Sequence, residues 1–194
     1  MLGRLYDWTL KKAASPAAKV WLFIISFAES SIFPIPPDVL LVPMCLARRA
    51  QSFAFAGICT LGSVLGGVLG YAIGALFFAT IGQTILGIYG GQAAMADLRL
   101  LYAEQGFMIV AFAAFTPFPF KVVTIASGAM SMDLGSFVIA SFLARGGRFL
   151  IEAALLWRFG EQIRQFIEKR LTLVTLIIGI AAIIFILIGK GIIN

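Results

Sequence analysis

The feature that most constrains this chain is the segment Phe53–Ile81, which contains no charged residue. A transmembrane helix needs about 20 consecutive apolar residues, so this run is long enough to cross a bilayer. Over the whole chain 61% of residues are hydrophobic and 12% are charged, whereas soluble domains average about 45–50% and about 25%. We therefore predict an all-α, multi-pass integral membrane protein that forms one membrane domain over residues 1–194.

The same composition argues against several classes of function. The chain has no histidine, which removes histidine-based catalysis and histidine metal sites. Its two cysteines, Cys45 and Cys59, lie in apolar stretches and form neither a disulfide framework nor a metal site. We expect no enzyme, no cofactor and no metal, and proton chemistry would have to use Asp, Glu, Lys or Tyr. The net charge is +6, but the basic residues flank apolar runs as in membrane proteins, so we expect no nucleic-acid binding.

A cluster of prolines interrupts the first apolar run, 20–47. Pro34, Pro36 and Pro37 lie in its middle, and a regular helix cannot pass through them because proline lacks an N–H and clashes with the preceding turn. Each half of the run is shorter than the roughly 20 residues that a span needs. We predict a re-entrant hairpin over 20–47, with a single kinked helix as the alternative.

The apolar run 107–130 repeats this pattern. When the two motifs are aligned, Pro34 falls on Pro117 and Pro36 falls on Pro119, which predicts a second re-entrant hairpin. If the N-terminus is cytoplasmic, the two hairpins enter from opposite sides and form an inverted repeat. Secondary transporters are often built in this way, with the substrate site near the midplane. The sequence leaves open whether the hairpins are re-entrant or span the membrane fully.

The other segments are assigned from length and charge. Four glycines at a spacing of four residues share one face of the helix 53–81, which suits close packing within the chain or in a homo-oligomer. In this arrangement ten Lys or Arg residues fall on the cytoplasmic side and two outside, as the positive-inside rule requires. The glycines are Gly62, Gly66, Gly70 and Gly74, and the other expected segments are an interfacial helix over 1–19, a mixed loop over 82–105 with a short helix near 93–103, and transmembrane helices over 134–159 and 171–189.

Charged residues inside the apolar segments are the candidate functional groups, because each costs at least about 2.5–3.5 kcal/mol to place in a bilayer. Arg145, Arg148 and Glu152 share one helix face at spacings of three and four residues. Arginine and lysine suit phosphate oxygens, so we predict that Arg145, Arg148 and Lys121 bind an anionic substrate, supported by Glu152. The alternative is that these charges form a structural ion pair, and Arg148 with Glu152 is one such pair.

Two acidic residues, Glu29 and Asp38, are predicted to couple transport to protons. Both lie in or beside the first interrupted run, and in a chain without histidine they are the best candidates for reversible protonation. For Asp38 the alternative is a structural role, because a residue that follows two prolines can act as the N-cap of a helix. The prolines of both motifs are assigned a supporting role, which is to expose backbone amides at the hairpin tips.

Short motifs spread over residues 21–170 form a combined pattern. The motifs are Phe-Ala-Glu-Ser-Ser at 27–31, Pro-Ile-Pro-Pro-Asp at 34–38, Gly-Gly-Val-Leu-Gly-Tyr at 66–71, Phe-Thr-Pro-Phe-Pro-Phe-Lys at 115–121, Ala-Ser-Gly at 126–128 and Arg-Gly-Gly-Arg at 145–148. Together they resemble the DedA family, also called the VTT-domain family, in its YqaA-type branch.

The resemblance implies a bacterial inner-membrane protein with two opposed re-entrant hairpins. It also implies lipid transport, of phospholipid or of undecaprenyl phosphate, often driven by the proton-motive force. The paired membrane acids of the family map onto Glu29 and Asp38. The family motif at the second hairpin usually carries two arginines, whereas this chain has Lys121 for the later one and none for the earlier. We infer that Arg145 and Arg148 supply the missing charge, and the identity of the lipid stays open.

These observations lead to one functional hypothesis and its rivals. The hypothesis is a flippase for a phosphate-bearing lipid, with membrane lipids and protons as partners and an N-terminus in the cytoplasm. A small-ion or drug/proton exchanger would use the same charges without moving lipid. A structural membrane protein would depend on the glycine ladder and not on the buried charges.

Overall fold

The computed structural model describes residues 17–32, 36–82, 92–116, 118–160 and 162. In these residues every regular element is a helix, which confirms the predicted all-α class for the part described. The expected transmembrane helix over 171–189 and nearly all of the expected interfacial helix over 1–19 lie outside it. The elements are α2 (Ala18–Ser31), α3 (Asp38–Ala47), the short turn η1 (Arg49–Gln51), α4 (Ser52–Phe77), the π-helical turn η2 (Phe78–Gly82), α6 (Gln92–Phe115), α7 (Phe120–Ala129) and the helix Leu134–Gly160.

Three helices are long and apolar enough to cross a membrane. Two of them, Arg49–Thr80 and Leu134–Gly160, agree with the predicted spans over 53–81 and 134–159. The third, Met95–Phe115, lies where the sequence predicted a mixed loop with a short helix near 93–103, followed by the first arm of a hairpin. Here α6 is continuous from Gln92 to Phe115, because this stretch has no proline and its charged residues are exposed on the helix surface without breaking it.

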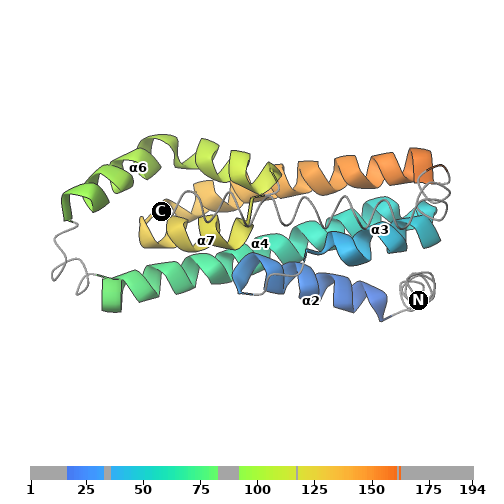
Figure 1. Cartoon of the computed structure of the whole chain (residues 1–194), viewed down its shortest axis with the longest axis horizontal. Helices are drawn as coiled ribbons and strands as arrows, with labels where there is room; N and C mark the ends of the chain where they lie inside the picture. Colours follow the sequence, from blue (N-terminus) through green and yellow to red (C-terminus); the bar gives the residue numbers. More distant parts are fainter. Residues whose placement is uncertain (1–16, 33–35, 83–91, 117, 161, 163–194) are drawn as a thin grey trace, which may run out of the picture.

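The helices form two antiparallel pairs laid along two long helices (Figure 1). Helices α2 and α3 run in opposite directions, and so do α6 and α7, while α4 and Leu134–Gly160 extend along most of the molecule. The C-terminal end of α2 and the N-terminal end of α7 both lie near the middle, and the two pairs extend toward opposite ends. The middle of the molecule is therefore where segments far apart in the sequence meet.

The glycine ladder of α4 provides the surface on which both pairs pack. A Cβ on Gly62 would stand 2.7 Å from the carbonyl oxygen of Phe23 in α2. A Cβ on Gly74 would overlap the backbone of Ile125 in α7, and one on Gly70 would meet both helices. The ladder thus lets two backbones approach α4 at close range, as small-residue spacing does in membrane helices. It is used for packing inside the chain.

A proline precedes each of the two short helices. Pro37 is the N-cap residue of α3 and Pro119 is the N-cap residue of α7, and both helices are ten residues long. The sequence alignment paired Pro119 with Pro36, so the two helix starts correspond with an offset of one residue. Such an offset is within the usual uncertainty of helix boundaries. Pro34 and Pro117 lie outside the described residues.

The connection from α7 to the helix Leu134–Gly160 is a tight, fully bonded turn. Ser131 has a φ of 59°, and the N–H groups of Ser131 and Met132 donate to carbonyls of the last turn of α7 at 3.0 Å, as in a Schellman motif. The carboxylate of Asp133 then accepts a hydrogen bond of 2.7 Å from the backbone N–H of Ser136. This bond holds the pKa of the Asp133 carboxyl below its usual range.

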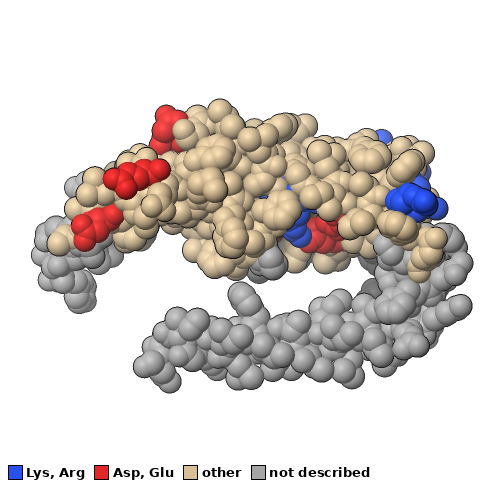
Figure 2. Space-filling view, turned by 90° about the horizontal axis from the view of Figure 1, so that it is seen from above, with Lys and Arg blue, Asp and Glu red and all other residues tan. Residues whose placement is uncertain are grey.

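The two ends of the molecule carry opposite charge (Figure 2). Acidic side chains gather at one end and basic side chains at the other. Asp97 and Glu104 lie in the first half of α6, and Asp133 lies in the nearby turn. At the opposite end the Nε of Arg49 donates to the Trp157 carbonyl at 3.2 Å, which ties the start of α4 to the end of the helix Leu134–Gly160.

Candidate functional site

The candidate site lies where the ends of the two helix pairs meet on α4. Thr124 of α7 donates from its hydroxyl to the carbonyl of Ser30 in α2 at 3.1 Å, and both residues are completely buried. This bond joins the two pairs directly. The helix Leu134–Gly160 passes the same junction and brings Arg145, Arg148 and Glu152 to it.

The first ion pair at the junction joins Arg145 to Glu29. The Arg145 guanidinium binds the Glu29 carboxylate, and its Nε donates to the hydroxyl of Ser63 at 2.6 Å. The Ser63 hydroxyl lies 2.7 Å from that of Ser30, which is 3.1 Å from Glu29 Oε2. The four side chains therefore form a closed ring across three helices. Only 2% of the Arg145 side chain is exposed, and such a buried charge requires this degree of hydrogen bonding.

Two aromatic rings complete the enclosure of Arg145. Its guanidinium carbon lies 4.9 Å from the ring centre of Phe120 and 5.0 Å from that of Phe149. Both rings are fully buried, and a cation over an aromatic face at this range is attracted to it. Arg145 is thus held by α2, α4, α7 and its own helix. Its position links both helix pairs.

The second ion pair joins Arg148 to Asp38 and is more open. The side chain of Arg148 is 24% exposed and that of Asp38 is 29% exposed. One oxygen of Asp38 binds the guanidinium, while the other, Oδ1, is buried and has no donor among the described residues. The structure corrects two alternatives here: Arg148 makes its ion pair with Asp38 and not with Glu152, and Pro37 occupies the N-cap position in place of Asp38.

The two remaining candidates, Lys121 and Glu152, differ in their surroundings. Lys121 is half-buried at the start of α7, directly after Phe120, and within the described part of the chain it makes no ion pair. Glu152 is also half-buried, and it lies one helical turn after Arg148, the arginine that binds Asp38. The structure thus gathers the two arginines and three acids into one cluster. Lys121 is connected to this cluster through its neighbour in the sequence, Phe120, whose ring contacts Arg145.

The neutral residues of the site were not singled out from the sequence. Ser30 and Ser63 bridge the first ion pair, and Phe120 and Phe149 sandwich Arg145. A signal existed for the serines, because a hydroxyl inside an apolar helix needs a partner and Ser63 adjoins the glycine ladder. The phenylalanines carried no signal, because the chain has 18 of them.

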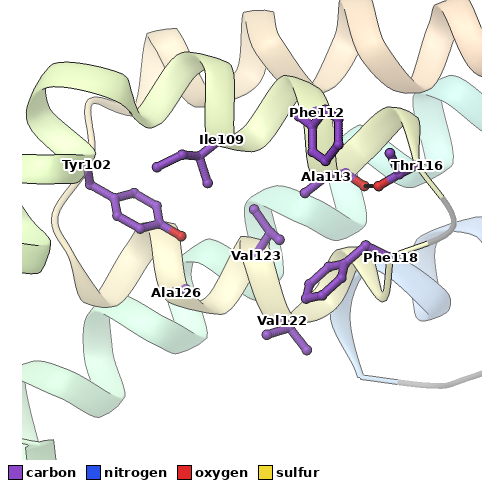
Figure 3. Close-up of a pocket in the computed structure, with 9 residues that line it drawn as sticks. All are labelled: Tyr102, Ile109, Phe112, Ala113, Thr116, Phe118, Val122, Val123 and Ala126. Carbon is purple, nitrogen blue, oxygen red and sulfur yellow. Dashed lines mark hydrogen bonds between the residues drawn. The ribbon is translucent and has the colours of Figure 1, made fainter. Parts of the chain in front are cut away.

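An apolar hollow of about 410 Å³ lies between α6 and α7 (Figure 3). Side chains of Phe112, Phe118, Val122 and other apolar residues line it, and the hydroxyl of Thr116 is satisfied by the Ala113 carbonyl at 3.3 Å. Of the lining residues, Val122 directly follows Lys121 in the sequence and Phe118 lies three residues before it. A hollow of this size and lining suits a hydrocarbon chain. In the residues described, no three His, Cys, Asp or Glu side chains are arranged so that they could hold a metal ion.

Comparison with known proteins identifies relatives over most of the chain. Residues 35–158 match the VTT domain family. An uncharacterized protein of Haemophilus influenzae is 35% identical over 192 residues, which covers 98% of this chain and 99% of that protein. An uncharacterized protein of Histophilus somni is 33% identical over 172 residues, which covers 87% of this chain and 90% of that protein. No solved structure matches the chain.

Proposed function

This chain is a multi-pass membrane protein of the VTT-domain, or DedA, family, and from that premise we propose that it moves a phosphate-bearing lipid across the bacterial cytoplasmic membrane. The lipid class is phospholipid or undecaprenyl phosphate. The observation that carries the proposal is the pair of Arg–carboxylate bridges at the junction of the two helix pairs, one sealed and one partly open. A charged cluster at this depth is costly and is typical of a transport site.

In this proposal the two re-entrant hairpins of an inverted repeat are the α2–α3 pair and the segment 107–130, which consists of the end of α6 together with α7. The two helix pairs extend in opposite directions, and the C-terminal end of α2 and the N-terminal end of α7 both lie near the middle, which supports this assignment (Figure 1). The prolines at the starts of α3 and α7 support it as well. The basic end of the molecule faces the cytoplasm according to the positive-inside rule. The N-terminus then lies in the cytoplasm, and rocking of the hairpins gives alternating access to the site.

Arg148 is the arginine that meets the lipid phosphate first. Its bond to Asp38 is partly open to the surroundings, and a phosphate offers a guanidinium the same paired oxygens as a carboxylate does. Lys121, without an ion pair in the described residues, adds a second positive charge. Arg145 adds a third positive charge, and it stays paired with Glu29 until the site opens. The apolar hollow between α6 and α7 takes one hydrocarbon chain of the lipid.

Protonation of Glu29 and Asp38 couples this step to the proton gradient. A protonated carboxyl group binds a guanidinium weakly, so that the arginine becomes free for phosphate. Loss of the proton on the other side restores the ion pair and releases the lipid. Proton uptake and lipid binding therefore favour each other.

The test uses the full-length protein in proteoliposomes, with a labelled phospholipid and a labelled isoprenoid phosphate, each with and without a pH gradient. Arg148→Ala should lower the translocation rate at least about tenfold, because a hydrogen bond to a charged group contributes roughly 1.5–3 kcal/mol. Arg148→Lys should retain part of the rate. Arg99→Ala, a change of an exposed arginine on α6, serves as the matched control and should leave the rate unchanged.

A wild-type rate in folded Arg148→Ala protein would rule out this site. Ion flux driven by the pH gradient without movement of either lipid would indicate the exchanger instead.

A further inference from the structure

Glu152 is the one acid of the cluster that no arginine binds. The junction holds two arginines and three acids, and the two ion pairs use Glu29 and Asp38. Among the described residues no basic group lies within salt-bridge distance of Glu152. With all five groups ionised, the cluster carries one uncompensated negative charge in a half-buried position.

The groups around Glu152 do not offset this excess charge. Helix α3 brings the Asp38 carboxyl and the Cys45 thiol, and α4 brings the Cys59 thiol. On its own helix the nearest charged group is Arg148, whose ion pair is with Asp38. Beyond these lies the sealed pair of Arg145 and Glu29, which is neutral. In the part of the chain that the structure describes, no neighbour therefore supplies Glu152 with a positive charge that is not already used.

Glu152 follows Arg148 by one turn of the helix Leu134–Gly160 and therefore lies beside the guanidinium that binds Asp38. Both carboxyl groups are acceptors when ionised, so a hydrogen bond between them exists only when one of them holds a proton. Two ionised carboxylates at this range would repel each other strongly in a medium of low dielectric constant. Asp38 Oδ1 is moreover buried without a donor in the described residues, and a proton on Glu152 would provide that donor.

From this geometry we propose that Asp38 and Glu152 share one proton, so that Asp38, Glu152 and Arg148 together form a neutral group. When a phosphate takes Arg148, the carboxyl pair is left with one negative charge. A second proton from the water on that side neutralises it. One proton therefore enters this carboxyl pair with each phosphate and leaves it when Arg148 returns to Asp38. The coupling step rests on the proposed function, whereas the shared proton does not.

The shared proton is tested by infrared spectroscopy of the full-length protein in lipid vesicles during a pH titration. The wild type should show the carbonyl band of a protonated carboxylic acid at neutral pH. Glu152→Gln should lack this band, and Glu104→Gln, a change of an exposed acid on α6, should retain it. If no such band exists at neutral pH, or if it survives Glu152→Gln and disappears in Glu29→Gln, the shared proton is wrong.

The coupling is tested separately by the lipid translocation rate at acidic and at alkaline pH. Glutamine keeps an N–H donor for Asp38, so Glu152→Gln should fold. Its translocation rates at acidic and at alkaline pH should become equal. Glu104→Gln should keep the wild-type ratio of these two rates. A wild-type ratio in Glu152→Gln would refute the coupling. A wild type that moves no lipid but shows the infrared band would overturn the proposed function and leave the shared proton standing.

Discussion

The two Arg–carboxylate pairs have the same chemistry but different burial, which gives a quantitative prediction. Glu29→Gln and Asp38→Asn each remove one negative charge with little change in volume. Glu29→Gln leaves Arg145 without a counter-charge in a site where 2% of its side chain is exposed. Removing one partner of a buried ion pair costs about 3–5 kcal/mol. The amide oxygen of glutamine keeps one hydrogen bond, so we expect a loss near the lower limit, about 3 kcal/mol.

The open pair should be far less sensitive. Arg148 and Asp38 are 24% and 29% exposed, so that solvent or lipid headgroups can take over part of the interaction. Exposed ion pairs contribute about 0–1 kcal/mol, and we expect Asp38→Asn to cost about 1 kcal/mol. The two variants should therefore differ by about 2 kcal/mol in the free energy of unfolding.

The assay is equilibrium unfolding of the purified protein from a mild detergent into a denaturing one, followed by tryptophan fluorescence. The double variant Glu29→Gln with Arg145→Gln provides the control, because replacing both partners removes the unpaired charge. It should be more stable than the sum of the two single losses implies. Equal losses for Glu29→Gln and Asp38→Asn, or a larger loss for Asp38→Asn, would show that burial does not separate the two pairs.

Two further predictions concern the backbone. Gly74→Ala should destabilise the protein by about 1–3 kcal/mol, because its Cβ would meet the Ile125 backbone, which cannot move aside like a side chain. Gly57→Ala on the same helix, with nothing within 4 Å, should stabilise it by up to about 1 kcal/mol; equal effects in the same unfolding assay would contradict the close approach. Ser131→Gly should raise the stability by about 1 kcal/mol, because serine is strained at a φ of 59°, and a loss of stability would mean that this strain is absent.

Much of the fold follows from the sequence because apolar length and proline placement act locally. The helices over 53–81 and 134–159 were predicted from long, largely apolar runs, and the starts of α3 and α7 were indicated by prolines. The first half of α6 was predicted only as a short helix near 93–103 within a loop, because charged residues lowered its hydropathy, and its continuity with the following apolar segment was missed. A polar residue on an exposed helix face does not interrupt the backbone hydrogen bonds, so composition alone gave the wrong boundary.

The sequence determined which charged residues lie among apolar segments, and therefore where a site is expected. Only the tertiary structure decided their partners. Spacing along one helix allowed a pair of Arg148 with Glu152, but Arg148 binds Asp38 from α3. The depth and rotation of α2 and α3 against α4 fix this choice, and they depend on backbone contacts at glycines far from the charges in sequence. Which pair is sealed, which is open, and which acid is left over are consequences of packing, because burial is a property of neighbours and not of the residue itself.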